Sequence, residues 1–147
     1  MQLSKNCKVI QVITPTAGAA GTTAIEGTVV DTQGYGGAMF ITTFGAIVTG
    51  AATSLKVQQG TDATVTDAAD LAGTSQTIAD DDDGQVFVSD IKKPLERYLR
   101  LYVSRATQNA TVASAEVILY DPVDAPTTMT SATVTCESFV SPAEGTA

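Results

Sequence analysis

The sequence contains no histidine among its 147 residues. This absence removes the commonest general base, the usual metal ligand and every Ser-His or Cys-His nucleophile. Cysteine is also scarce: Cys7 and Cys136 lack the CxxC spacing of a structural zinc site. The stretch GTTAIEGT at 21–28 lacks the GK[ST] ending of a phosphate loop. We therefore expect no enzymatic activity and no cofactor.

Basic residues are few: eight Lys and Arg stand against 16 Asp and Glu, for a net charge of −8. Nucleic acid and anionic membranes both bind clustered basic residues, so neither is an expected partner. No apolar run approaches the length of a membrane span. The apolar stretch 9–13 alternates with polar residues, which indicates a strand and not a signal peptide.

Tryptophan is absent, and charged residues make up only 16% of the chain, against roughly 25% in an average soluble protein. The 44% hydrophobic content argues against disorder and favours sheets that bury one face. The length fits a single domain. Cys7 and Cys136 pair if the first and last strands adjoin; otherwise they are two free buried thiols, the interpretation that cytoplasmic synthesis favours.

Gly, Pro, Asn and Asp punctuate the chain at short intervals between β-branched runs, which predicts an all-β sandwich or barrel. We expect about eight strands, at 7–14, 24–31, 38–43, 54–59, 85–91, 97–106, 113–120 and 131–137. In the sixth, Leu99, Leu101 and Val103 form one apolar face. In the seventh, the apolar face consists of Ala113, Ala115, Val117 and Leu119. The polar segment 107–111 between them predicts a hairpin.

The connecting segments carry their own expectations. The small residues of 15–23 predict a loop or an arm hinge. The turn at 31–37 predicts positive φ at Gly34, Gly36 and Gly37, with Asp31 capping the backbone two residues on. Residues 64–73 predict one helical turn, capped by Thr66 or Asp67 and stopped by Gly73.

Four consecutive aspartates stand in IADDDDGQVF at 78–87. Asp81 and Asp83 match positions 3 and 5 of an EF-hand loop, but Ala79 at position 1 offers no side-chain ligand, so that motif is excluded. A looser cation loop at Asp81 and Asp83 and a solvated turn both remain open, and Asp83-Gly84 favours the turn.

Charge is segregated along the chain. Eight acids and no bases lie between 62 and 90, and five of the eight bases lie between 92 and 105. Either the two regions neutralise each other within one molecule, or they meet across subunits and set the register of an assembly.

Residues 24–126 resemble small structural proteins encoded beside the capsid genes of tailed bacteriophages. The resemblance is carried by Asp31-Thr32-Gln33-Gly34-Tyr35, Ser54-Leu55-Lys56-Val57-Gln58 and Arg97-Tyr98-Leu99-Arg100-Leu101. These are turn and strand signatures. The group is similar to head cement, or decoration, proteins, which are jelly-roll β-barrels that clamp neighbouring major capsid proteins from outside.

The resemblance implies a jelly-roll-like core at 24–126, flanked by an N-terminal strand and flexible arm at 1–23 and a C-terminal strand and tail at 127–147. It implies a virion protein, made in the bacterial cytoplasm, that stabilises the capsid exterior. Its expected partners are the major capsid protein and copies of itself, as a dimer or a trimer. Expected contact residues are Leu3, Val9, Arg97, Arg100 and Phe139. The alternative is a glycan- or receptor-binding module on the virion.

Overall fold

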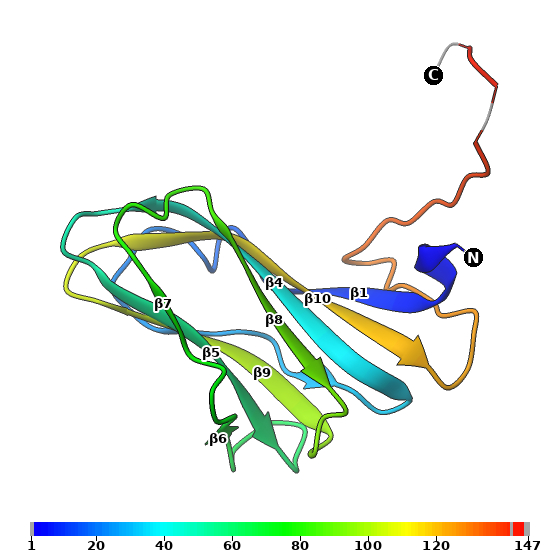
Figure 1. Cartoon of the computed structure of the whole chain (residues 1–147), viewed down its shortest axis with the longest axis horizontal. Helices are drawn as coiled ribbons and strands as arrows, with labels where there is room; N and C mark the ends of the chain where they lie inside the picture. The colour runs from blue at the N-terminus through cyan, green and yellow to red at the C-terminus, as the bar shows by residue number, and fades with distance from the viewer. Residues whose placement is uncertain (1, 142, 146–147) are drawn as a thin grey trace.

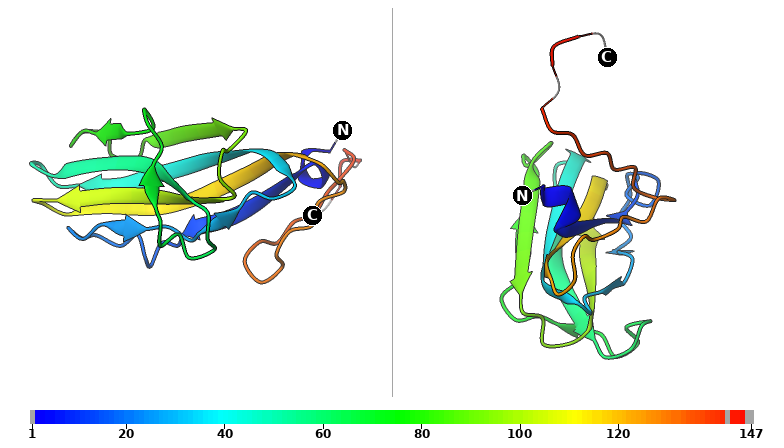
Figure 2. Two further views of the ribbon diagram at one scale, coloured as in Figure 1. Left: turned by 90° about the horizontal axis from the view of Figure 1, so that it is seen from below. Right: turned by 90° about the vertical axis from the view of Figure 1, so that its right-hand side faces the viewer.

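The computed structural model describes residues 2–141 and 143–145. They form two antiparallel β-sheets packed face to face, as Figure 1 and the edge-on views of Figure 2 show. The predicted all-β sandwich is therefore confirmed. Among the described residues, no helix is long and apolar enough to cross a bilayer.

Sheet A has the strand order β1 (Cys7–Ile13), β10 (Ala110–Pro122), β4 (Tyr35–Ile47) and β8 (Val86–Lys92). In sheet B, the long strands β9 (Tyr98–Ala106) and β5 (Ala52–Gly60) lie at the centre. Two short strands, β2 (Ile25–Glu26) and β3 (Val30–Asp31), pair with the outer side of β9. Two more, β6 (Ala69–Asp70) and β7 (Gln76–Ile78), pair with the outer side of β5. A short 3-10 helix, η1 (Leu3–Lys5), precedes β1.

The strand pairs are nested. β1 pairs with β10, β2 and β3 with β9, β4 with β8, and β5 with β6 and β7. The chain crosses from one sheet to the other between successive strands, except from β2 to β3 and from β5 through β6 to β7, which all lie in sheet B. The predicted hairpin of the sixth and seventh strands is therefore wrong, because β9 lies in sheet B and β10 in sheet A.

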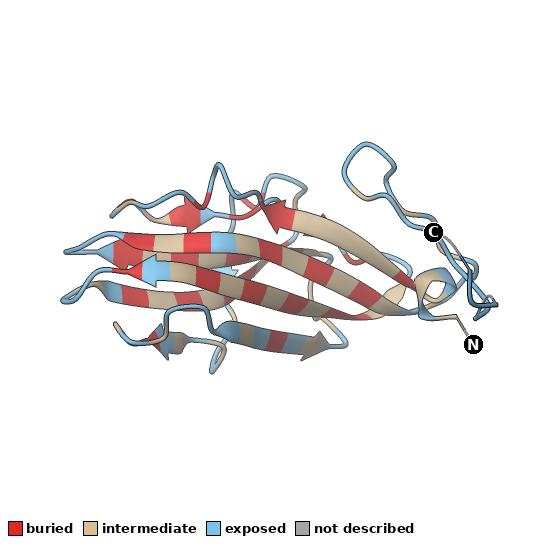
Figure 3. Ribbon diagram, turned by 90° about the horizontal axis from the view of Figure 1, so that it is seen from above, coloured by how far each residue is buried: buried red, intermediate tan, exposed pale blue. Residues whose placement is uncertain are grey.

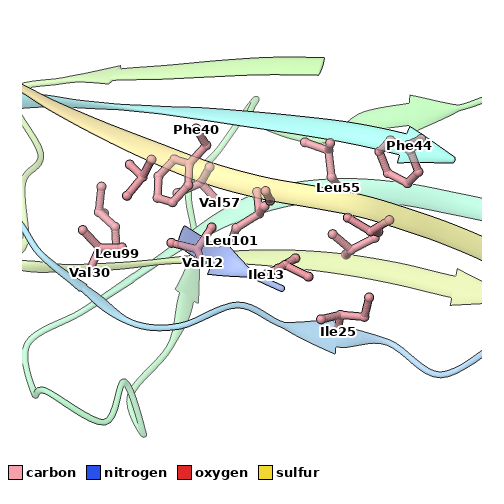
Figure 4. Close-up of a cluster of buried hydrophobic side chains, with 14 of the residues drawn as sticks. Val12, Ile13, Ile25, Val30, Phe40, Phe44, Leu55, Val57, Leu99 and Leu101 are labelled. Carbon is pink, nitrogen blue, oxygen red and sulfur yellow. The ribbon is translucent and has the colours of Figure 1, made fainter. Parts of the chain in front are cut away.

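The core fills the space between the sheets. Figure 4 shows Phe40 and Phe44 of β4 among side chains of sheet B such as Leu55 and Leu101, and all four are 1% exposed or less. Buried and half-buried bands alternate along the long strands in Figure 3, as the two-residue period of a strand requires. Ala115, Val117 and Leu119 face the core as predicted, whereas Ala113 is exposed because β10 changes register near Val112.

The turn after β3 follows the prediction in part. Asp31 Oδ1 accepts the Gln33 backbone N–H at 3.0 Å, and Gly34 has φ +85°. Gly36 and Gly37 instead lie within β4, and neither has positive φ. They are needed for space, because a Cβ on Gly37 would stand 2.2 Å from the ring of Tyr120. These glycines therefore serve side-chain packing across the sheet.

Two further predictions are wrong. Residues 64–73 form turns and β6 in place of a helical turn, because Asp62 and Asp67 bind nearby threonines: Thr64 N–H donates to Asp62 Oδ1 at 2.7 Å and Thr61 N–H to Asp67 Oδ2 at 2.9 Å. Residues 131–137 form a turn and irregular chain, although their β-branched composition suggested a strand. Strand propensity needs a neighbouring edge to pair with, and no pairing is found for this segment.

Residues 15–23 form a loop, the first of the two expected alternatives, and this loop is tied to the sandwich. The guanidinium of Arg105, which is only 8% exposed, donates to the carbonyls of Ala19 (2.7 Å), Thr23 (2.7 Å) and Ala110 (2.9 Å). Gly21 forms an antiparallel bridge with Ala110. Burial lowers the pKa of Arg105. One buried cation therefore fixes the long connection between the sheets.

Candidate functional site

The outward side of sheet A carries a set of apolar residues. Along β4, Ala38, Phe40 and Thr42 are buried, so the alternate positions Met39 and Ile41 point outward. Register extends this side across the sheet: Met39 stands opposite Ile118 of β10, and Ile41 stands opposite Val88 of β8. We call the following residues the sheet A face: Val9, Met39, Ile41, Val86, Val88 and Ile118.

The sheet A face is accessible. Val86 and Val88 are 55% and 49% exposed, and the other four residues are half-buried. None of the six belongs to the core cluster or packs against it. Charged groups stand around them, at Glu116, Asp90 and Lys92. A contiguous apolar area within a polar border is the pattern of an interaction surface.

Tyr120 lies beside this face and crosses β4 above Gly37. Its hydroxyl donates to Asp90 Oδ1 at 2.7 Å, which links β10 to the edge strand β8. Desolvation and this hydrogen bond raise the pKa of Tyr120 to about 12. The hydroxyl therefore stays protonated at neutral pH and holds the Asp90 carboxylate toward its own sheet.

The outward side of sheet B is polar and internally bonded. Arg97 binds Asp31 through two hydrogen bonds of 2.9 and 2.6 Å. This hydrogen bonding is the largest cause of the lowered pKa of Asp31. Arg100 binds Glu26 at 2.9 Å and Gln58 at 2.7 Å. The expected contact residues Arg97 and Arg100 are thus engaged within the chain.

Aromatic rings on the outward side of sheet B are covered by cations. Lys56 Nζ lies 5.1 Å from the ring centre of Tyr102, and Arg97 Cζ lies 5.0 Å from that of Tyr98. Lys56 also binds Asp70 at 2.7 Å. A glycan-binding platform needs open aromatic faces, and these two are occupied by cation–π contacts.

The acidic turn at 80–83 is hydrogen-bonded to the connection between β4 and β5. Asp80 accepts the N–H of Gly50 at 2.6 Å and Asp83 that of Ile47 at 2.7 Å, so both carboxylates hold the β4–β5 connection. Asp82 accepts the N–H of Ala79 at 2.7 Å, within its own turn. Gly84 has φ +74°, as a turn residue. The solvated-turn interpretation missed this bonding, which nothing in the local sequence signals.

The structure places Asp81 and Asp83 without a cation-binding arrangement around them. Asp83 is directed to Ile47, and Asp81 is exposed. In the part of the chain that the structure describes, no three acidic or cysteine side chains gather as metal ligands.

The two segregated charge regions are not joined by a direct ion pair in the part of the chain that the structure describes. The three ion pairs among the described residues are Lys56–Asp70, Arg97–Asp31 and Arg100–Glu26. None joins the basic segment 92–105 to the acidic segment 62–90. Within the basic segment, Arg97 and Arg100 are paired elsewhere and Arg105 is buried, so Lys92 and Lys93 are its exposed charges outside these ion pairs.

The C-terminal segment runs back along η1 and the free edge of β1. Thr127 N–H donates to the Lys5 carbonyl at 2.9 Å, and Ser4 and Ser138 hydroxyls lie 2.6 Å apart. The N–H of Val9 meets only the thioether of Met129, at 3.2 Å. A pocket of about 420 Å³ lies between the two segments.

This terminal end also exposes apolar side chains. Leu3 and Phe139, both expected contact residues, are 63% and 69% exposed. Cys7 is buried, and its pKa is raised chiefly by that burial, whereas Cys136 is exposed; both are free thiols. The prediction of a buried thiol is therefore confirmed for Cys7 and wrong for Cys136, because the strand expected around Cys136 does not form.

Sequence reasoning found Val9 but missed Met39, Ile41 and Ile118. The signal was present in the run AMFI at 38–41, where both alternating positions are apolar. Such a run indicates a strand with two apolar sides. Since β4 is covered by sheet B on one side only, the apolar residues on its other side remain outside the core.

Comparisons with protein-family models and with curated proteins give no match to the chain. Among solved structures, dimeric latent PorU from Porphyromonas gingivalis aligns with 80% of this chain at 9% identity and a TM-score of 0.44, and the chain spans 13% of its length. PirA aligns with 78% of this chain and 93% of its own at 12% identity and a TM-score of 0.36. At these values neither protein informs the function of this chain.

Proposed function

We propose that this protein is a structural component of a tailed-phage virion that binds the capsid exterior and stabilises the shell by clamping neighbouring major capsid proteins. The role is one of binding and not of catalysis. The contrast between the two sheets supports the sheet A face as the binding surface. Sheet A presents apolar side chains outward, whereas sheet B presents a polar network whose groups bind one another.

The partner in this proposal comes from the resemblance of residues 24–126 to capsid cement proteins. The nested strand pairing supports it, because β1 with β10, β2 and β3 with β9, β4 with β8, and β5 with β6 and β7 is the order of a jelly roll. We therefore propose the jelly-roll class within the β-sandwich. Viral capsid proteins and lectins are among the domains built this way.

Docking through the sheet A face removes apolar area from water without breaking bonds within the protein. Met39, Ile41 and Ile118 make no polar contact that a partner must replace. On sheet B, by contrast, a partner would have to compete with the Arg97–Asp31 and Arg100–Glu26 pairs. The exposed Leu3 and Phe139 add apolar contacts at the terminal end. Many copies on a symmetric shell multiply a weak single contact by avidity.

The test is co-sedimentation of the purified protein with empty capsids that lack it. We expect saturation at a fixed ratio to the major capsid protein and a raised thermal rupture point of the shell. Met39→Lys places a charge in the centre of the sheet A face and should weaken binding at least tenfold.

Ser104→Lys is the matched control, because Ser104 faces outward on sheet B opposite Ser54. Equal binding by the two variants would refute the sheet A face as the docking surface. No binding of the wild type to capsids, together with hits in a glycan screen, would replace the proposal with a receptor-binding module.

A further inference from the structure

The edge strand β8 leaves one row of backbone groups without a neighbouring strand. Phe44 N–H donates to the Gln85 carbonyl at 3.0 Å, and Lys93 N–H donates to the Gly36 carbonyl at 2.8 Å. Alternation along an antiparallel pair then turns the backbone groups of Phe87, Ser89 and Ile91 toward β4. The backbone groups facing away from β4 belong to Val86, Val88, Asp90 and Lys92.

This edge has little of the protection that monomeric sheets use. Its one contact among the described residues is a side chain from the other sheet, the amide of Gln76, which donates to the Val88 carbonyl at 3.1 Å. No proline or bulge interrupts β8, and its register with β4 is unbroken. Val86 and Val88 are half exposed beside the open backbone groups. Exposed apolar edge strands of this kind pair with other strands.

The opposite edge of sheet A differs. There the C-terminal segment lies along β1, where Thr127 donates to Lys5 and to the Cys7 carbonyl. One edge of the sheet is thus occupied by the chain itself, and the β8 edge is open.

The two ends of the β8 edge carry charges of opposite sign. The acidic turn Asp80–Asp83 precedes the strand, and Lys92 and Lys93 stand at its end. A second copy running antiparallel brings its Lys92 and Lys93 to the start of β8, next to the acidic turn of the first copy, and the same approach occurs at the other end by symmetry. The opposite charges at the two ends of β8 therefore become complementary only when two β8 strands run in opposite directions.

We propose that β8 pairs antiparallel with β8 of a second copy about a two-fold axis near Ser89, which joins the two A sheets into one sheet of eight strands. In this register Val86 stands opposite the second copy's Lys92, and Val88 stands opposite its Asp90. Each Asp90 is held toward its own sheet by Tyr120 (2.7 Å), which limits repulsion between the two carboxylates. The pairing is independent of capsid binding.

Sedimentation equilibrium of the full chain over a range of concentrations tests the pairing without capsids. We expect a monomer–dimer equilibrium whose Kd rises at least tenfold in Val88→Glu, which places a carboxylate opposite the second copy's Asp90. Val123→Glu is the matched control, because Val123 is 80% exposed and lies beyond β10, and its Kd should equal that of the wild type. A wild-type chain that stays monomeric at 
roughly millimolar concentration, a regime that covers weak dimers, would overturn the proposal.

Charge reversal and amide exchange identify the surface. Lys93→Glu and Asp81→Lys should each weaken the dimer, and the double variant should restore it. The amide protons of Val86 and Val88 should exchange slowly in the dimer and rapidly in the Val88→Glu variant. A dimer that leaves these amides unprotected, or that ignores both charge variants, forms through another surface and contradicts the pairing.

Discussion

Replacing Arg105 with methionine tests the buried cation that holds the loop 15–23. The side chain makes three hydrogen bonds to the carbonyls of Ala19, Thr23 and Ala110. Hydrogen bonds from a charged donor contribute about 1.5–3 kcal/mol each. The substitution also removes the cost of burying the guanidinium, which is several kcal/mol of lost solvation. This gain offsets part of the free energy lost with the hydrogen bonds. We expect a net loss of about 2–3 kcal/mol.

For a chain of this length that loss corresponds to a melting temperature lower by roughly 5–12 °C. Calorimetry measures the shift, and hydrogen exchange should show faster exchange of the amides of Gly18 and Gly21, which donate from this loop to the carbonyls of Thr14 and Ala110. Arg97→Met is the control, because Arg97 forms a largely exposed ion pair, which contributes little to stability. Equal destabilisation by the two variants would refute the reasoning.

Three other predictions concern single contacts. Because the pKa of Tyr120 is raised to about 12 in the folded protein, the stability that its hydroxyl contributes is complete below pH 10 and is lost as pH rises toward 12; denaturation across this range should be less pH-dependent in Tyr120→Phe. Because Arg97 lowers the pKa of Asp31, the stability from this carboxylate is present above about pH 4 and is lost in acid, so Asp31→Asn should flatten the acid limb of the stability curve. Gly37→Ala places a methyl group 2.2 Å from the Tyr120 ring and should cost about 1–3 kcal/mol in chemical denaturation, which Tyr120→Ala should largely relieve in the double variant.

The long strands could be predicted from the sequence because their alternation is local. Leu99, Leu101 and Val103 point to one side wherever β9 lies. Whether two alternating strands share a sheet or face each other across a core is not encoded in that pattern. The polar turn at 107–111 suits a hairpin and a crossover equally, and here the apolar sides of β9 and β10 meet across the sandwich.

The contacts between distant loops could not be predicted. Asp80 and Asp83 read as turn residues, and their carboxylates hold the backbone about thirty residues earlier. Arg105 occupies an inward position of β9, where an alternation pattern expects an apolar residue. In both cases a polar side chain satisfies the backbone of a segment remote in sequence, and only the folded arrangement reveals its partner.

The nested pairing has a consequence for synthesis of the protein. β10 is the last strand to leave the ribosome, yet it lies between β1 and β4 in sheet A. Until residue 122 is available, β1 has no partner, and the edge of β4 that β10 will cover is open. The nascent chain therefore carries unpaired strands until β10 has been synthesised. Because contacts so distant in sequence form slowly, we expect slow folding and a dependence on holdase chaperones that recognise exposed apolar strands.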